Sequence, residues 1–117
     1  MSCNKTNAEW SPCITQGQTF NDPLQIAING VIGYDPTDTF VGWITIQEEA
    51  DAVLVDYDMV KTDPVNGLLT PTLTPTETQT LPQGGLYHSI EWTRVATGEV
   101  IVITGRPVIK ANAKKRP

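Results

Sequence analysis

Glycine and proline interrupt this chain at short intervals, and their spacing restricts the elements that can form between them. The chain holds nine glycines and nine prolines in 117 residues, more than a helical protein of this length would tolerate. The clearest turn signals lie at 29–38, 62–67, 70–85 and 96–99. Intervals of roughly ten residues between turns are typical of β-strands. We therefore predict a single all-β domain.

The segments between the turns follow the two-residue period of strands. Within 53–59 one face is apolar (Val53, Val55, Tyr57, Met59), whereas Asp56 and Asp58 fall on the other face. This pattern predicts a half-buried strand with its acids in water. The alternation of Leu24, Ile26 and Ile28 with more polar residues predicts another.

Two further segments, 39–47 and 100–105, are apolar or neutral on both faces, which predicts strands in the core of a sandwich. Weaker strand signals lie at 10–15 and 68–73. Helix signals are nearly absent, and the one run of helix formers, 45–53, is interpreted as a turn between strands.

The stretch LPQGGLYHSIEW (81–92) places a proline and two glycines directly before an alternating strand. In immunoglobulin-like sandwiches, a tyrosine near the start of strand F bonds upstream backbone where the chain crosses between sheets. This corner needs an apolar residue upstream, a residue of free backbone conformation before the strand, and the tyrosine itself. The sequence supplies them as Leu81, Gly85 and Tyr87. We therefore predict an immunoglobulin-like antiparallel β-sandwich of about seven strands. Barrels and jelly rolls are the alternatives.

This interpretation places Trp43 at the core tryptophan position of strand C. The two positions of the usual inter-sheet disulfide hold Ile28 and Ser89, so apolar packing is expected to join the sheets. No apolar signal region precedes Cys3 and Cys13, which are expected as free thiols in a reducing cytosol, although their pairing stays open.

The order of these segments resembles a family of small structural domains of tailed bacteriophages, similar to the N-terminal domain of an upper baseplate protein. The matching segments are QGQTFNDPLQI (16–26), VGWITIQ (41–47), 66–92, and TGEVIVITGRPVIK (97–110). The sharpest element is Thr80-Leu81-Pro82 with Gly85 and Tyr87. The resemblance implies an immunoglobulin-like sandwich that serves in the virion through contacts with other virion proteins, in several copies. Tail, baseplate or fibre adaptor is the expected position.

Two alternative functions remain at this stage: capsid decoration on the head exterior, and a glycan-binding module for surface adhesion. The glycan module requires an exposed tryptophan. Trp43 and Trp92 are expected in the core, and Trp10 is expected to be the most exposed of the three.

Charge is divided unevenly along the chain. Residues 1–109 hold all 13 acidic residues and four basic ones, a net charge of −9, whereas residues 110–117 carry +4. So acidic a body is not expected to bind nucleic acid, except through the basic tail. We predict an N-terminal arm (1–15), a sandwich (16–109) and a basic tail (110–117). No apolar run is long enough for a membrane span.

No catalytic or cofactor-binding residues are predicted. His88 is the single imidazole, and it is interpreted as a packing residue whose strand points Ser89 to the opposite face. Asp35 with Asp38, or Glu48, Glu49 and Asp51, offer oxygen ligands of the kind that calcium prefers. Their spacing matches no known calcium loop, so no metal site is predicted.

The predicted contacts with partners lie in three regions of the chain. The prolines of the loop 69–82 restrict its backbone before a partner binds, so that docking costs less conformational entropy. The N-terminal arm carries an aromatic residue, and the tail carries cations. The candidate contact residues are Trp10, Leu73, Pro75, Lys114, Lys115 and Arg116.

Overall fold

The computed structural model describes residues 4–5, 10–28, 30–46 and 53–111. Strands dominate this part of the chain, and its single helix is the five-residue α1 (Pro75–Gln79). The predicted all-β sandwich is therefore confirmed. Among the described residues, no helix has both the length and the hydropathy that a membrane crossing requires.

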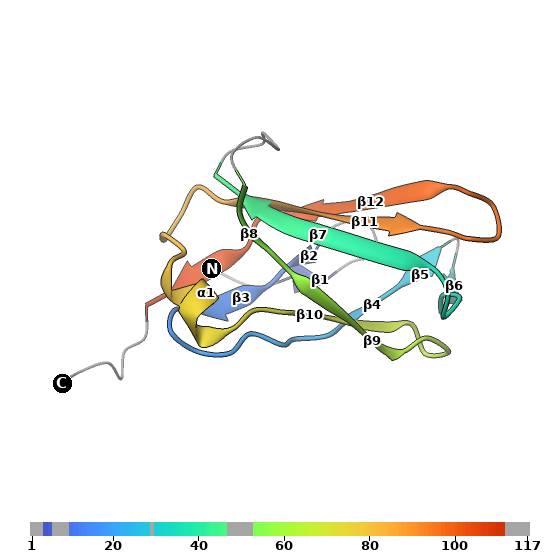
Figure 1. Cartoon of the computed structure of the whole chain (residues 1–117), viewed down its shortest axis with the longest axis horizontal. Coiled ribbons are helices and arrows are strands. Elements are labelled where there is room, and N and C mark those ends of the chain that lie inside the picture. The colour runs from blue at the N-terminus through green and yellow to red at the C-terminus, as the bar shows by residue number, and fades with distance from the viewer. Residues whose placement is uncertain (1–3, 6–9, 29, 47–52, 112–117) are drawn as a thin grey trace.

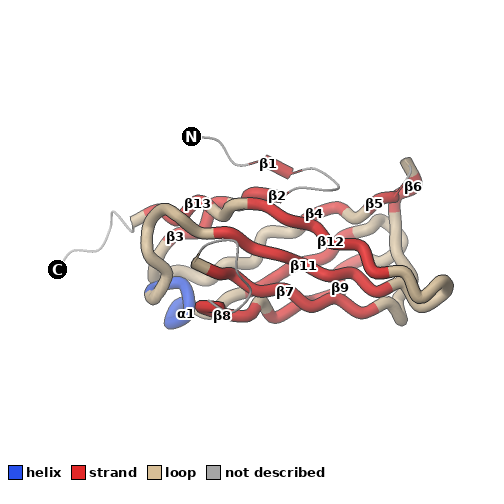
Figure 2. The backbone as a smooth tube through the Cα atoms, turned by 90° about the horizontal axis from the view of Figure 1, so that it is seen from above, coloured by secondary structure: helices blue, strands red, loops and turns tan. Residues whose placement is uncertain are grey.

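Two antiparallel sheets form the sandwich (Figures 1 and 2). The smaller sheet has the order β4-β10-β9, which are Leu24–Gln25, Leu68–Thr72 and Asp58–Asp63. The larger has the order β12-β11-β7-β8, which are Val100–Gly105, Tyr87–Thr93, Thr39–Thr45 and Val53–Asp56. In the larger sheet, β8 is the edge strand beside β7.

Three short strand pairs complete the fold. Two are antiparallel: β1 (Asn4–Lys5) with β2 (Trp10–Ser11), and β5 (Ala27–Ile28) with β6 (Val31–Ile32). The third joins β3 (Cys13–Thr15) in parallel to β13 (Val108–Lys110), so the beginning of the sandwich lies against its end.

The strands β8 and β9 are one extended run that passes from one sheet to the other. β8 pairs with β7 in the larger sheet, and β9 pairs with β10 in the smaller one. The change occurs at Tyr57, whose backbone N–H donates to the carbonyl of Gly42 over 2.9 Å. The predicted alternation is confirmed at 56–58, where Tyr57 is buried and Asp56 and Asp58 are exposed, whereas Val53, predicted on the apolar face, is 45% exposed. The change of sheet was not predicted.

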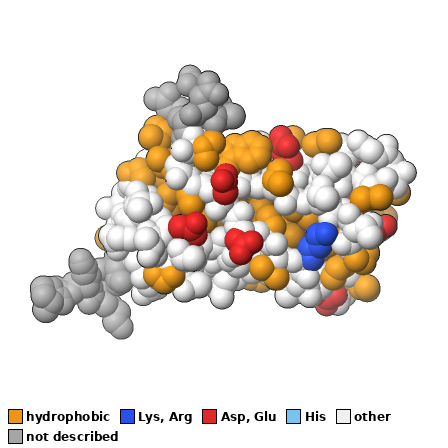
Figure 3. Space-filling model, in the orientation of Figure 1, with side chains coloured by type: hydrophobic (Ala, Val, Ile, Leu, Met, Phe, Trp, Pro, Cys, Tyr) orange, Lys and Arg blue, Asp and Glu red, His pale blue; other side chains and the backbone are white. Residues whose placement is uncertain are grey.

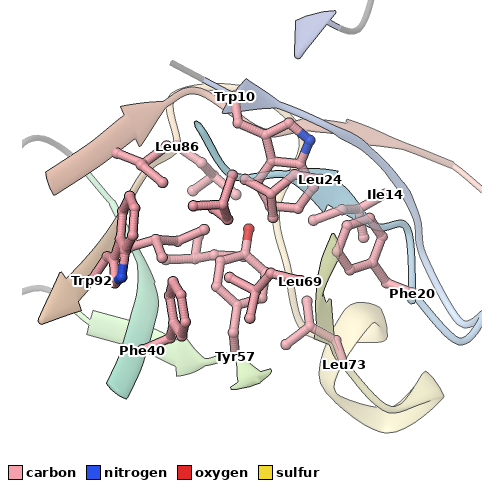
Figure 4. Close-up of a cluster of buried hydrophobic side chains, with 14 of the residues drawn as sticks. Trp10, Ile14, Phe20, Leu24, Phe40, Tyr57, Leu69, Leu73, Leu86 and Trp92 are labelled. Atoms are coloured by element: carbon pink, nitrogen blue, oxygen red, sulfur yellow. The ribbon is translucent and has the colours of Figure 1, made fainter. Parts of the chain in front are cut away.

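The core lies between the two sheets and includes side chains of β2 and β3 (Figure 4). Trp10 and Ile14 are fully buried. Residues 10–15 therefore belong to the sandwich, and the prediction of an arm over 1–15 was wrong for them. The physical reason is that β3 pairs with β13 and so fixes the apolar side chains of this segment over the core. Residues 1–3 and 6–9 lie outside the described residues.

Trp43 was predicted in the core, but it lies half-buried on the outer face of β7. Phe40, Gly42 and Ile44 take the inward positions of that strand, so the two-residue period turns Trp43 outward. The buried indole belongs instead to Trp92 on β11, as predicted. Trp92 stacks on Phe40 with ring centroids 5.9 Å apart, and its Nε1–H donates to the carboxylate of Asp38 over 2.7 Å.

The turn before β11 forms as predicted, but the tyrosine corner does not. Gly84 and Gly85 adopt φ of 86° and 76°, and Leu81 is buried. Tyr87 points to the outer face, where its ring lies 4.8 Å from the guanidinium of Arg106. Its hydroxyl has no hydrogen bond to any described residue. The inward position next to it is filled by Leu86.

The loop 69–82 differs from the prediction because it contains the helix α1. Thr74 and Glu77 form a reciprocal capping box, and Pro75 occupies the first helical turn. Leu73, predicted as a contact, is buried and bridges to Phe20.

Cys13 was expected as a free thiol, but it is disulfide-bonded, and Cys3 lies outside the described residues.

The packing of β2 against β12 generates a prediction for Gly105. A Cβ atom at this position would collide with the backbone carbonyl of Trp10 and would lie 2.8 Å from His88 Nε2. We expect Gly105→Ala to destabilise the domain by about 3 kcal/mol or more, because the obstacle is backbone. Urea unfolding measures this loss.

Gly98→Ala is the control. A Cβ at Gly98 has no neighbour within 4 Å, but φ is 72°, so the strain alone should cost about 1 kcal/mol. Equal losses in the two variants would contradict the proposed packing of β2.

Candidate binding groove at the open edge

A groove of about 510 Å³ lies where β8 and β9 diverge from β7. It is lined by Phe40, Val41, Gly42, Trp43, Asp56, Tyr57, Asp58 and Met59. Figure 3 shows the face of the molecule that carries these strands, with acidic side chains next to hydrophobic ones. The groove therefore combines apolar walls with negative charge.

The change of sheet at Tyr57 creates this groove. The absence of a side chain at Gly42 lets the chain cross close to β7, since a Cβ there would lie 2.5 Å from Met59 Cε and 3.1 Å from Tyr57 Cδ2. Tyr57 turns its ring into the core. Because alternate residues point to opposite sides, the flanking Asp56 and Asp58 are both exposed.

The two carboxylates of the groove have no partners within the described part of the chain. Trp43 and Asp56 occupy paired positions on β7 and β8, so their side chains are neighbours on one face. Neither the Asp56 nor the Asp58 carboxylate accepts a hydrogen bond from a described residue. No lysine or arginine of the described ranges lines the groove. This chemistry suits a cation that rests on the indole and pairs with the carboxylates.

The described cations near the two sheets are engaged elsewhere. Lys61 donates to the carbonyl of Pro36 over 2.9 Å, and Arg94 pairs with Glu99 at 3.1 Å. Arg106 stacks on Tyr87. The two carboxylates of the groove are therefore not neutralised by these three side chains.

Behind the groove, a buried chain of hydrogen bonds crosses the core. His88 Nε2 lies 2.5 Å from the Trp10 carbonyl oxygen, and Nδ1 lies 2.8 Å from the Tyr57 hydroxyl. Because a carbonyl only accepts, Nε2 carries the hydrogen and Nδ1 accepts from Tyr57. Burial of the imidazole lowers the pKa of His88 to about 4, against an opposing contribution from the Trp10 carbonyl. Burial also raises the pKa of Tyr57.

This geometry fits the interpretation of His88 as a packing residue. Its side chain is 2% exposed and stacks on Trp10 with ring centroids 5.5 Å apart. Ser89 points to the opposite face of β11, as its different burial indicates. The structure therefore does not bring these two side chains together.

The acidic residues considered for calcium have other roles where they are described. Asp38 is buried and accepts hydrogen bonds from the Trp92 indole and from the backbone N–H of Val95. Asp35 accepts from the backbone N–H and hydroxyl of Thr37, and these bonds lower its pKa. Over the described ranges, no group of three or more His, Cys, Asp or Glu could hold a metal ion. Residues 48, 49 and 51 lie outside those ranges.

The predicted contact residues are not assembled into one site. Trp10 and Leu73 are buried and cannot touch a partner, whereas Pro75 is exposed at the start of α1. Lys114, Lys115 and Arg116 lie outside the described residues.

The groove residues were not predicted as a site, although one signal for two of them was present. The alternation over 53–59 correctly placed Asp56 and Asp58 in water. It could not show that Asp56 stands opposite Trp43, because that depends on the register of β8 against β7. A scan against protein-family models finds no match for this chain, and no curated protein matches it.

The buried imidazole makes the stability of the domain depend on pH. The unfolded chain binds a proton at His88 near the ordinary histidine pKa of 6.5, whereas the folded chain resists protonation until about pH 4. Stability is therefore lost as pH falls between these values. From about pH 7.5 to about pH 5 we expect a loss of about 2 kcal/mol from this residue.

Urea unfolding at several pH values measures this dependence. His88→Gln cannot titrate, so its free energy of unfolding should change less over the same interval. If the variant and the parent lose stability with the same slope, the buried neutral imidazole is refuted.

Proposed function

We propose that this chain is a non-enzymatic structural component of a tailed bacteriophage virion that acts through protein–protein contacts. The tail, baseplate or fibre adaptor is the favoured position, and capsid decoration is the alternative. The support for the virion is the resemblance of residues 16–110 in sequence. The support for a docking role is the outer face of the larger sheet.

That outer face carries the observation on which the docking role rests. Val41 and Val100 are each 53% exposed, and Val102 is 46% exposed. Glu91 on the central strand pairs with Val102 on one side and with Val41 on the other, so these side chains form one row across three strands. Trp43 and Tyr87, both half-buried, lie on the same face.

A sheet face of this composition is suited to a protein partner. Burial of exposed valines lowers the free energy of the complex, and aromatic side chains contribute strongly to the binding energy at the centre of interfaces. The antiparallel sheets hold the face rigid, so that docking orders little of the backbone. In a particle with many copies, weak contacts of this kind add up to firm attachment.

The experiment examines purified particles for the protein and for a variant with an altered face. We expect the parent chain in fixed ratio to the other structural proteins. Val100→Lys with Val102→Lys should reduce incorporation about tenfold or more, because two charged ends then meet an apolar partner surface. Quantitative mass spectrometry of the particles measures the ratio.

Val65→Lys is the control for an added surface lysine because Val65 is 82% exposed and lies in the turn between β9 and β10. Its incorporation should equal that of the parent. Particles that lack the parent protein would refute the virion role, and equal incorporation of all variants would refute docking through this face.

A further inference from the structure

We propose that the groove between β7 and the run of β8 and β9 receives the basic C-terminal segment (110–117) of a second copy of this chain. This proposal deepens the proposed function by naming one partner, and it rests on that function only for the presence of several copies side by side. The contact would be head-to-tail, with the groove of one copy holding the tail of the next.

The first argument is the chemistry of the groove. Asp56 and Asp58 present two exposed carboxylates with no partner among the described residues, and Trp43 offers part of an indole face beside them. A lysine or arginine can contact the indole face and a carboxylate at the same time. A neutral apolar ligand would leave both carboxylates without a counterpart.

The second argument is the charge complementarity within the sequence itself. Half of the eight basic residues of the chain lie in the last eight positions, and none of the acidic residues do. The tail begins at Lys110, the last residue of β13. It supplies Lys114, Lys115 and Arg116 in direct succession. Such a segment matches a groove that holds two carboxylates in an acidic body.

The third argument is the position of the tail and of the groove on the sandwich. β13 follows directly on β12, and β12 and β8 are the opposite edges of the larger sheet. The groove lies at the β8 edge. Figure 2 shows β13 and β8 on opposite sides of the molecule. A tail that leaves one edge and a groove on the other edge allow copies to join in a row or a ring.

The test is a charge exchange in the full-length chain. Self-association is measured by sedimentation at low salt, where exposed charge pairs are least screened. We expect Asp56→Lys with Asp58→Lys to weaken association about tenfold or more, and Lys114→Glu, Lys115→Glu with Arg116→Glu to do the same. Combining both sets in one chain should restore association.

Asp58→Lys and Asp22→Lys form a matched pair because each changes the charge by the same amount. Asp22 is exposed and does not line the groove. We expect only Asp58→Lys to weaken association. Urea unfolding of each variant shows that the fold is retained, so that a loss of association is not a loss of structure.

Trp43 supplies a second measurement. Trp10 is fully buried and Trp92 is 2% exposed, so quenching of emission by acrylamide reports mainly on Trp43. Quenching should decrease as protein concentration rises, and the tail variant should abolish this change.

Four results would overturn the proposal. The first is self-association that salt does not weaken, and the second is a combined variant that does not recover self-association. The third is protection of Trp43 from acrylamide that does not depend on protein concentration. The fourth is protection of Trp43 by a neutral polysaccharide that the tail variant leaves unchanged. The third would mean that the tail binds the groove of its own chain, and the fourth that the groove holds a glycan. Particles that still contain the protein would leave the proposed function standing in each case.

Discussion

The hydrogen bonds of His88 connect three parts of the chain that are far apart in the sequence. Its ring joins the backbone of β2, the central strand β11 and the point where the run 53–63 changes sheets. In a core that excludes water, removing one partner leaves the others unsatisfied. The neutral imidazole, with one donor and one acceptor nitrogen, is suited to hold a carbonyl on one side and a hydroxyl on the other.

The strand pattern could be predicted from the sequence because it depends on local periodicity. The strands β7, β11 and β12, the exposed acids at 56 and 58, and the glycine turn before β11 were all predicted. The helix α1 was not, although the capping box at Thr74 and Glu77 is a local signal that was present. Its five residues are too few for the hydrophobic period of a helix to show.

The errors at Tyr87 and at Trp43 have a different cause. A two-residue period separates the faces of a strand but does not say which face meets the core. That choice follows from which partners lie across the sheets. A tyrosine does link separate strands through its hydroxyl inside this core, but it is Tyr57 rather than Tyr87. The sequence contained both candidates, and only the three-dimensional arrangement decides between them.

The groove and the core depend on the same change of sheet. Because Tyr57 turns inward to reach His88, its neighbours Asp56 and Asp58 turn outward on the same short segment. The separation of β8 and β9 from β7 that gives the ring its place also opens the surface beside Trp43. A change that removed the crossing would therefore remove both features, whereas a change in the carboxylates alone leaves the core intact. The core and the groove therefore share the backbone crossing at Tyr57, but Tyr57 faces the core and the two aspartates face the groove.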